Sequence, residues 1–162
     1  MTALRLSRIA LTTAVAVFFT LIAFGNVTDY GTNFAFVQHV LSMDTIFPDS
    51  TLRWRAITDP RLHHLAYGLI IAWQGATAAL LWLGVARLWA ARGATAGGWN
   101  AARGPALLGL TAGMLLYGLG FLVIAGEWFA MWQSRQWNGQ ATAAIFLGFC
   151  GLVLLHLARE EP

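Results

Sequence analysis

Four long stretches of this sequence carry no charged residue, and they limit the possible fold more than any other feature. They cover approximately residues 9–25, 64–86, 106–126 and 140–157. Each is close to the roughly 20 apolar residues that a helix needs to cross about 30 Å of hydrocarbon. Because they are continuously apolar and do not alternate, they predict helices and not the strands of a membrane barrel. We therefore predict an all-α, polytopic membrane protein, a single domain over residues 1–162 with four transmembrane helices.

The composition agrees with a membrane setting. Of the 162 residues, 58% are hydrophobic and only 10% are charged, whereas about a quarter of a soluble domain is charged. All ten basic residues are Arg, and they are scattered in ones and twos between the apolar stretches. Nucleic-acid binding would need a basic patch or stripe. We expect no nucleic-acid partner, and we expect the lipid bilayer together with other membrane-protein subunits or a homo-oligomer.

The placement of the Arg residues predicts the orientation. The Arg residues fall on two sides of the predicted membrane. On one side every short connection and terminus carries Arg. On the other side there are four Arg, and three of them fall in one long segment, where charges have less influence on the orientation. The first side holds Arg5, Arg8, Arg87, Arg92, Arg103 and Arg159, and the second holds Arg53, Arg55, Arg61 and Arg135. The prediction is a multi-pass membrane protein with both termini in the cytoplasm. A cleaved signal peptide at the first stretch is the alternative, and it would leave three helices.

A long periplasmic loop is predicted over residues 26–62, between the first and second helices. A loop of this length without secondary structure would be unusual. Apolar residues recur at helical spacing between Asn33 and Met43, which predicts a short amphipathic helix on the outer surface. The other outer connection, residues 126–140, contains Trp128, Trp132 and Trp137, and these predict an aromatic belt lying flat at the membrane interface.

Small residues mark the expected contacts between helices. Gly109, Gly113 and Gly120 share a face of the third helix, and Ala144 and Gly148 form a similar pair on the fourth. Because lipid gives apolar faces little reason to associate, small residues promote close packing of membrane helices. Packing within this bundle is the simplest interpretation, and an interface with another subunit is the alternative.

Three histidines on the outer side raise the question of a metal or haem. His39, His63 and His64 could combine with Asp44 or Glu127 in a site of mixed nitrogen and oxygen ligands. However, His63 and His64 are adjacent, so they point about 100° apart on a helix. We expect interfacial hydrogen bonding, with no metal ligand and no bound cofactor.

The chain offers little catalytic chemistry. The four predicted spans contain no Asp, Glu, Lys or Arg, whose burial in a membrane usually marks a path for protons or ions, and the polar content of their cores is Gln74 and a few threonines. A nucleophile paired with a base, a phosphate-binding loop and a zinc-protease motif are all absent. We predict no catalytic residue and no enzymatic activity, and Cys150 is interpreted as a packing residue.

Several segments resemble a known family. They are Asn26 to Thr45, Phe47-Pro48, Trp54 to Ile57, Gly126 to Phe129 and Trp132 to Ser134. In these segments the chain is similar to a proteobacterial family of predicted small integral membrane proteins without an assigned function, and the likeness covers nearly the whole chain. The resemblance implies a four-helix inner-membrane protein and supplies no catalytic residues. The family often has Glu where this chain has Gln74, a departure that weakens a proton-handling role.

The outer side also holds most of the polar side chains, and these form the candidate functional cluster. They could form a cap of mutual hydrogen bonds over the bundle or a surface that a partner recognises. The candidates are Asn26, Asp29, Tyr30, Asn33, His39, Asp44, His63, His64 and Glu127.

Three functions remain open at this point. The first is a non-catalytic accessory or structural subunit of a larger inner-membrane complex. The second is a redox protein that holds metal or haem through the periplasmic histidines. The third is a small transporter or lipid-binding protein with a groove between the second and third helices and Gln74 as its polar contact.

The predicted topology can be tested with alkaline phosphatase fusions, because this enzyme is active only in the periplasm. A fusion at Thr45 should be active, and fusions at Gly97 and at the C-terminus should be inactive. Activity at either of the last two positions would overturn the orientation, and a mature N-terminus near Asn26 would overturn the count of four helices.

Overall fold

The computed structural model describes residues 2–161, and within them the chain is almost entirely helical. The helices are α1 (Ala3–Thr28), α2 (Tyr30–Ser42), η1 (Thr51–Arg55), α3 (Pro60–Ala90), α4 (Ala96–Ala102), α5 (Gly104–Leu115), η2 (Leu116–Trp128), η3 (Met131–Gln133) and α6 (Gln140–Ala158). Four helical segments are long and apolar enough to cross a membrane, namely Ala3–Thr28, Pro60–Ala90, Ala96–Trp128 and Gln140–Ala158. The prediction of an all-helical chain with four such helices is confirmed.

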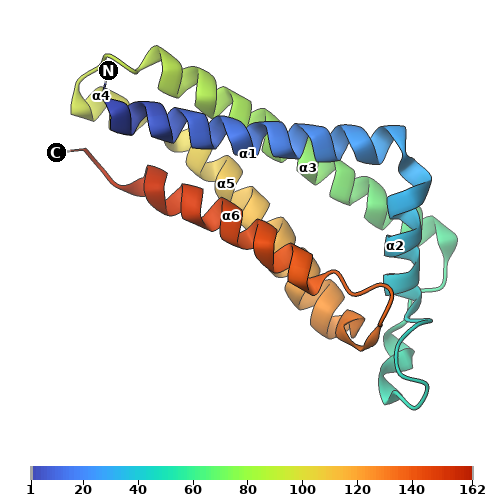
Figure 1. The fold of residues 1–162 in the computed structure, drawn as a ribbon. Coiled ribbons are helices and arrows are strands. Elements are labelled where there is room, and N and C mark those ends of the chain that lie inside the picture. Colours follow the sequence, from blue (N-terminus) through green and yellow to red (C-terminus); the bar gives the residue numbers. More distant parts are fainter. Residues whose placement is uncertain (1, 162) are drawn as a thin grey trace.

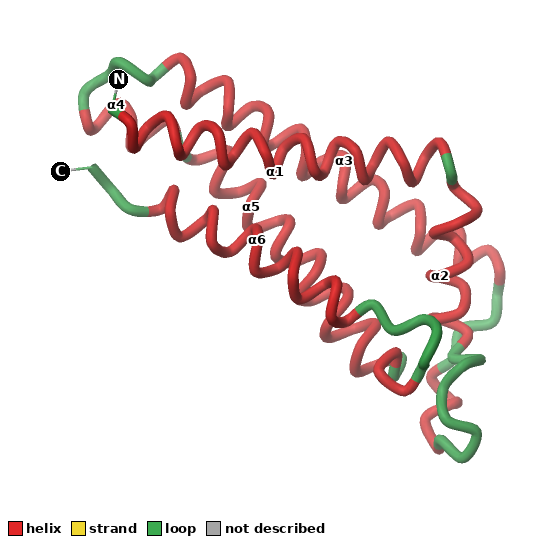
Figure 2. The backbone as a smooth tube through the Cα atoms, viewed as in Figure 1, coloured by secondary structure: helices red, strands yellow, loops and turns green. Residues whose placement is uncertain are grey.

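The four long segments run along a common direction, with the connections gathered at two ends (Figures 1 and 2). One end carries both termini and α4, and we call it the terminal end. The other carries α2 and residues 43–59 and 129–139, and we call it the cap end. In Figure 1, α1 and α6 are close together at the terminal end and diverge toward the cap end, where α2 turns across the bundle.

The longest helix begins where its sequence predicts. The Asp59 side chain accepts a hydrogen bond from the backbone N–H of Arg61, and Pro60 occupies the first helical turn of α3. Both choices suit a helix start, because Asp satisfies a free N–H group and Pro has none to satisfy.

Glycines bring α3 and α5 into close contact near the terminal end. A Cβ atom on Gly84 would lie 2.6 Å from the Cα of Ala106, and one on Gly109 would lie 2.8 Å from Cγ of Leu81. Such distances leave no room for a side chain, so the two helices approach each other closely only because these residues are glycines. Trp73 adds a hydrogen bond from its indole to the carbonyl of Ala112.

The other small residues do not form one continuous interface. Gly113 packs against Phe19 of α1 and Cys150 of α6, so it contacts other helices of the bundle. Gly120, in contrast, has only Leu116 of its own helix within reach. Ala144 and Gly148 are exposed on α6, so they do not interlock with the glycines of α5 as we expected.

The third spanning segment changes its helix type halfway. It is α-helical up to Leu115 and π-helical from Leu116 to Trp128. A π-helix has more residues per turn than an α-helix, so side chains further along η2 turn progressively away from the face that packs in α5. This rotation explains why Gly120 leaves the line of Gly109 and Gly113.

The region predicted as a long loop, residues 26–62, is mostly helical. Asn26 to Thr28 extend α1, and the next helix, α2, begins at Tyr30. The amphipathic helix expected between Asn33 and Met43 corresponds to α2, which begins three residues earlier. The loop prediction was too long because polar residues at the end of α1 continue the helix.

The connection between η2 and α6 folds into the cap end and does not lie flat. Trp128 and Trp132 are exposed, but Trp137 is half-buried and stacks on His39 of α2 at 4.6 Å between ring centroids. Two residues, Met43 and Ala130, have positive φ angles of 50° and 51°. Both are fully buried in one apolar cluster of the cap end, and this packing offsets the cost of about 1–2 kcal/mol for a left-handed residue.

Buried arginines close the terminal end. The guanidinium of Arg5 contacts Glu161 at 2.6 Å and donates to the carbonyl of Ala94 at 2.7 Å. Arg8 donates to the carbonyl of Arg159, and Arg103 donates to those of Leu157 and Ala158. The hydrogen bond from Arg5 lowers the pKa of Glu161 below its usual value. We call this set, with Glu161 at its centre, the arginine clamp.

The contact between α3 and α5 can be tested with two matched variants of α3. Gly84→Ala should lower the thermal midpoint in mild detergent, because the added methyl group forces two backbones apart at a cost of about 1–3 kcal/mol. Gly75→Ala should leave the midpoint unchanged or raise it, because nothing lies within 4 Å of its Cβ position. Equal effects of the two substitutions would contradict the proposed contact.

Candidate functional site

A chain of three side-chain amides connects α1, α2 and α3. The Nδ2 of Asn26 donates to Oε1 of Gln74 at 2.7 Å, and the Nδ2 of Asn33 donates to Oδ1 of Asn26 at 2.7 Å. Asn26 and Gln74 are 7% and 3% exposed. Tyr67 of α3 adds a long hydrogen bond of 3.4 Å to the carbonyl of Asn26.

Each of the three helices contributes one amide to this chain, and the buried amides of Asn26 and Gln74 thereby gain hydrogen-bond partners. A buried amide without a hydrogen bond costs about 1–3 kcal/mol, so Asn26 and Gln74 are best accommodated when they face each other. Polar pairs of this kind hold membrane helices together, with a measured average of about 0.6 kcal/mol. Gln74, which the sequence indicated as a polar contact, therefore has its partner on α1.

The amides line a cavity of about 570 Å³ at the cap end of the bundle. Its wall is formed by α1, α2, α3, η2 and α6. The residues that line it are Ile22, Gly25, Asn26, Asp29, Asn33, Phe36, Val37, Tyr67, Ile70, Gln74, Tyr117, Phe121, Asn138, Gly139, Thr142, Ala143 and Phe146. We call it the amide cavity.

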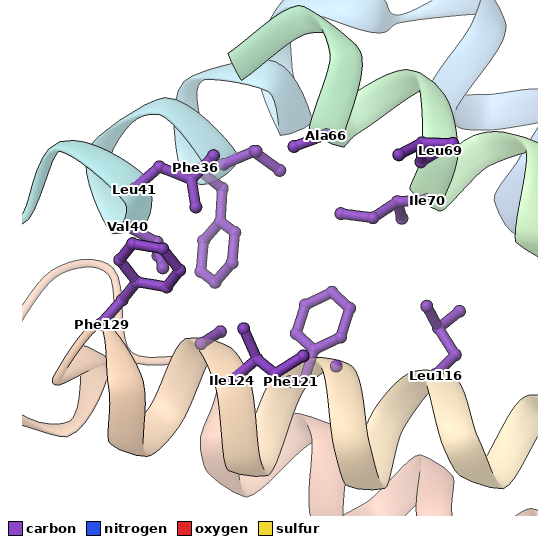
Figure 3. A pocket seen from close by; sticks show the side chains of 13 residues that line it. Phe36, Val40, Leu41, Ala66, Leu69, Ile70, Leu116, Phe121, Ile124 and Phe129 are labelled. Atoms are coloured by element: carbon purple, nitrogen blue, oxygen red, sulfur yellow. The ribbon is translucent and has the colours of Figure 1, made fainter. Parts of the chain in front are cut away.

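A second cavity of about 260 Å³ lies between α2, α3 and η2. Its lining contains no polar side chain among the described residues, and we call it the apolar cavity. Figure 3 shows side chains from these three elements pointing into it, including Leu41 of α2, Leu69 of α3 and Leu116 of η2.

The two cavities share one wall. Phe36, Val37, Ile70 and Phe121 line both of them. The rings of Phe36 and Phe121 are 6.3 Å apart between centroids and nearly parallel, and Figure 3 shows them approaching each other from α2 and η2. Only side chains therefore separate the amide cavity from the apolar cavity.

The histidines of the cap end are held apart by different partners. His39 contacts Asp44 at 2.8 Å, His63 contacts the carbonyl of Ile57 at 2.7 Å, and His64 contacts the hydroxyl of Tyr30 at 2.9 Å. Within residues 2–161, no three His, Cys, Asp or Glu side chains come together in a group that could hold a metal ion. The structure thus does not bring the three histidines into one ligand set.

The remaining candidates lie around the amide cavity or outside it. Asp29 is exposed and accepts a hydrogen bond from Thr32. The Tyr30 ring lies beside Phe34 and His64, which stack on each other at 4.1 Å between ring centroids. Glu127 is exposed, and its nearest polar partner is Gln140 at 3.5 Å. Of the nine candidates, Asn26, Asp29 and Asn33 line the amide cavity, whereas the histidines, Tyr30, Asp44 and Glu127 line neither of the two cavities.

The aromatic residues that line the amide cavity were not predictable from the sequence. Phe36, Tyr117 and Phe121 lie in apolar segments, where nothing distinguishes a cavity-lining ring from one that faces lipid or packs in the core. Tyr117 carried the only usable signal, since a tyrosine in a span brings a hydroxyl that needs a partner.

The bond between Asn26 and Gln74 can be measured with a double-mutant cycle. Asn26→Leu and Gln74→Leu should each lower the thermal midpoint, because each leaves the other amide buried without its partner. The double variant should lose less than the sum of the two, with a coupling of about 0.6–1.7 kcal/mol. Strict additivity would show that the two amides do not interact.

Comparison with known proteins identifies the family. A search of curated proteins and of solved structures gave no match. A family model described as "Predicted small integral membrane protein (DUF2165)" matches residues 4–160. The match covers nearly the whole chain, and it agrees with the resemblance in the segments around Asn26 to Thr45 and Gly126 to Phe129. The chain therefore belongs to this family of predicted small integral membrane proteins.

Proposed function

We propose that this protein is a non-catalytic membrane protein that binds one amphiphilic, lipid-like molecule at its cap end. The observation that carries the proposal is the pair of adjoining cavities, one lined by buried amides and the other entirely apolar. Their volumes of about 570 and 260 Å³ fall in or near the range of roughly 300–1,000 Å³ that is usual for small-molecule sites.

The division of the lining matches the two parts of an amphiphile. Asn26, Gln74 and Tyr117 supply hydrogen-bonding groups on one side of the shared wall. Leu41, Leu69 and Leu116 supply a purely apolar surface on the other. Ligand sites in proteins commonly combine a mostly apolar lining with a few polar groups that fix the orientation of the ligand.

The apolar cavity reaches the outer surface of the bundle. Leu69 and Ile124 line it and are 62% and 45% exposed. In a bilayer these two side chains face lipid, because both lie in helices that are long and apolar enough to span it. A lipid-like molecule can therefore enter sideways from the membrane, without crossing a polar surface.

The proposal is tested by filling the apolar cavity. Ala66→Phe places a ring in the lining of this cavity, whereas Ala72→Phe places the same ring on the exposed face of α3, outside both linings. Lipids extracted from the purified protein in nanodiscs are quantified by mass spectrometry. We expect one lipid species enriched in the wild type and in Ala72→Phe, and several-fold less of it in Ala66→Phe.

If the wild type carries lipids in the same proportions as empty nanodiscs, the cavities hold no specific amphiphile. Thermal midpoints of the two variants, measured on the same samples, show whether Ala66→Phe has remained folded.

A second candidate is the accessory or structural subunit of a larger inner-membrane complex, with both termini in the cytoplasm. The observation that favours it is the exposed small-residue pair Ala144 and Gly148 on α6, beside Ile145 and Leu152, which are 68% and 71% exposed. Small residues on a membrane-facing surface allow a second helix to approach. Chains that co-purify with the wild type in mild detergent and are lost from Gly148→Leu would support it, and recovery of a lone monomer would exclude it.

A further inference from the structure

We propose that the amide cavity selects an uncharged head group that accepts hydrogen bonds, such as a carbonyl, and rejects anionic lipid heads. This inference rests on the proposed function, since it names the chemical class of the molecule that the two cavities hold. It follows from the donors that the cavity leaves without partners, from the charges around it and from the rings in its wall.

Two donors that are open to the amide cavity have no partner among the described residues. The hydroxyl of Tyr117 makes no hydrogen bond within residues 2–161, although Tyr117 is only 4% exposed. The Nε2 group of Gln74 also makes none, because the bond to Asn26 uses only its Oε1 atom. Both residues line the amide cavity, and neither donor is among the fully buried side-chain atoms that lack a partner. A ligand in the cavity can therefore reach both donors and accept hydrogen bonds from them.

The charges around the two cavities disfavour an anionic ligand. The described linings contain no Arg, Lys or His. The only carboxylate is Asp29, which is exposed at the edge of the amide cavity. A phosphate or carboxylate head placed there would lose its hydration without gaining a cation, and burying an unpaired charge is strongly unfavourable.

The lining also provides an aromatic wall beside the unpartnered donors. Phe36, Tyr67, Tyr117, Phe121 and Phe146 all contribute to the amide cavity. Rings of this kind pack well against a flat or apolar head. A lipophilic quinone and a neutral acylglycerol both carry uncharged carbonyl groups on long apolar chains, so both fit this chemistry.

The chain of such a ligand would run into the apolar cavity. Phe36 and Phe121 form part of the wall between the cavities, and a ligand that occupies both would have to displace these rings. The head then lies beside Gln74 and Tyr117, and the tail lies against Leu69 and Leu116, close to the exposed edge of the bundle.

The test uses the full-length protein in nanodiscs of phosphatidylcholine, with three added probes. The probes are a decyl-substituted benzoquinone, a dioleoylglycerol and a dioleoyl phosphatidate, and binding is measured by isothermal titration. We expect saturable binding of the quinone, of the diacylglycerol or of both, and none of the phosphatidate. The ratio of the dissociation constants of the quinone and the diacylglycerol shows which of these two molecules the cavity prefers.

Three conservative variants assign the binding to the cavity. Tyr117→Phe removes only the unpartnered hydroxyl, so it should stay folded and weaken binding about two- to tenfold, the effect of one hydrogen bond. Gln74→Leu should weaken binding at least as much. Tyr30→Phe is the control, because its hydroxyl contacts His64 and lies outside both linings, so binding should not change.

The outcomes separate the two proposals. Phosphatidate binding as tight as that of the uncharged probes, or unchanged binding by Tyr117→Phe and Gln74→Leu, would overturn the selectivity and leave an amphiphile site intact. No binding of any probe, together with no lipid enriched on the purified protein, would overturn both.

Discussion

The close approach of α3 and α5 at Gly84 determines the shape of the molecule. With no side chain at this position, the two backbones come within contact distance near the terminal end, and their crossing fixes where the bundle is narrow. The arginine clamp holds α1 and α6 together at the same end. Toward the cap end the helices diverge (Figure 1), and the divergence creates the space that the cavities occupy.

The space at the cap end persists because α2 bridges the diverging helices. Its side chains reach α1 and α3 through Asn33 and Phe34, and η2 through Phe36. Apolar side chains alone would favour collapse of such a space, since close packing is the rule in protein interiors. The buried amides oppose collapse, because they must keep their hydrogen bonds, and the left-handed residues Met43 and Ala130 fix the turns that position the cap end.

The fold could be predicted from the sequence to a large extent, and the site only in part. Uncharged stretches define membrane helices because lipid offers the backbone no hydrogen bonds, so the four long helices were predictable. The spacing of Phe34, Val37 and Val40 predicted α2, because apolar residues three or four positions apart lie on one face of a helix. Gln74 stood out as a polar residue in an apolar stretch, and the structure pairs it with Asn26.

Features that depend on contacts between distant helices could not be predicted. The extension of α1 through Asn26 is stabilised by Gln74, which lies 48 positions away in the sequence. The π-helix of η2 has no local sequence signal, yet it helps to set the direction of Phe121, which lines both cavities. The histidines were grouped by their predicted side of the membrane, but local partners such as Asp44 and Tyr30 hold them apart.

The arginine clamp also has a consequence for biosynthesis. Glu161, which binds the guanidinium of Arg5, is synthesised after all four long helices. Arg5 and Arg8 are therefore without this carboxylate while the first three helices enter the membrane, and the terminal end can close only after Glu161 has left the ribosome. Insertion of the helices and locking of the bundle are thus separate events in time, and a chain stopped before Glu161 would be inserted but not locked.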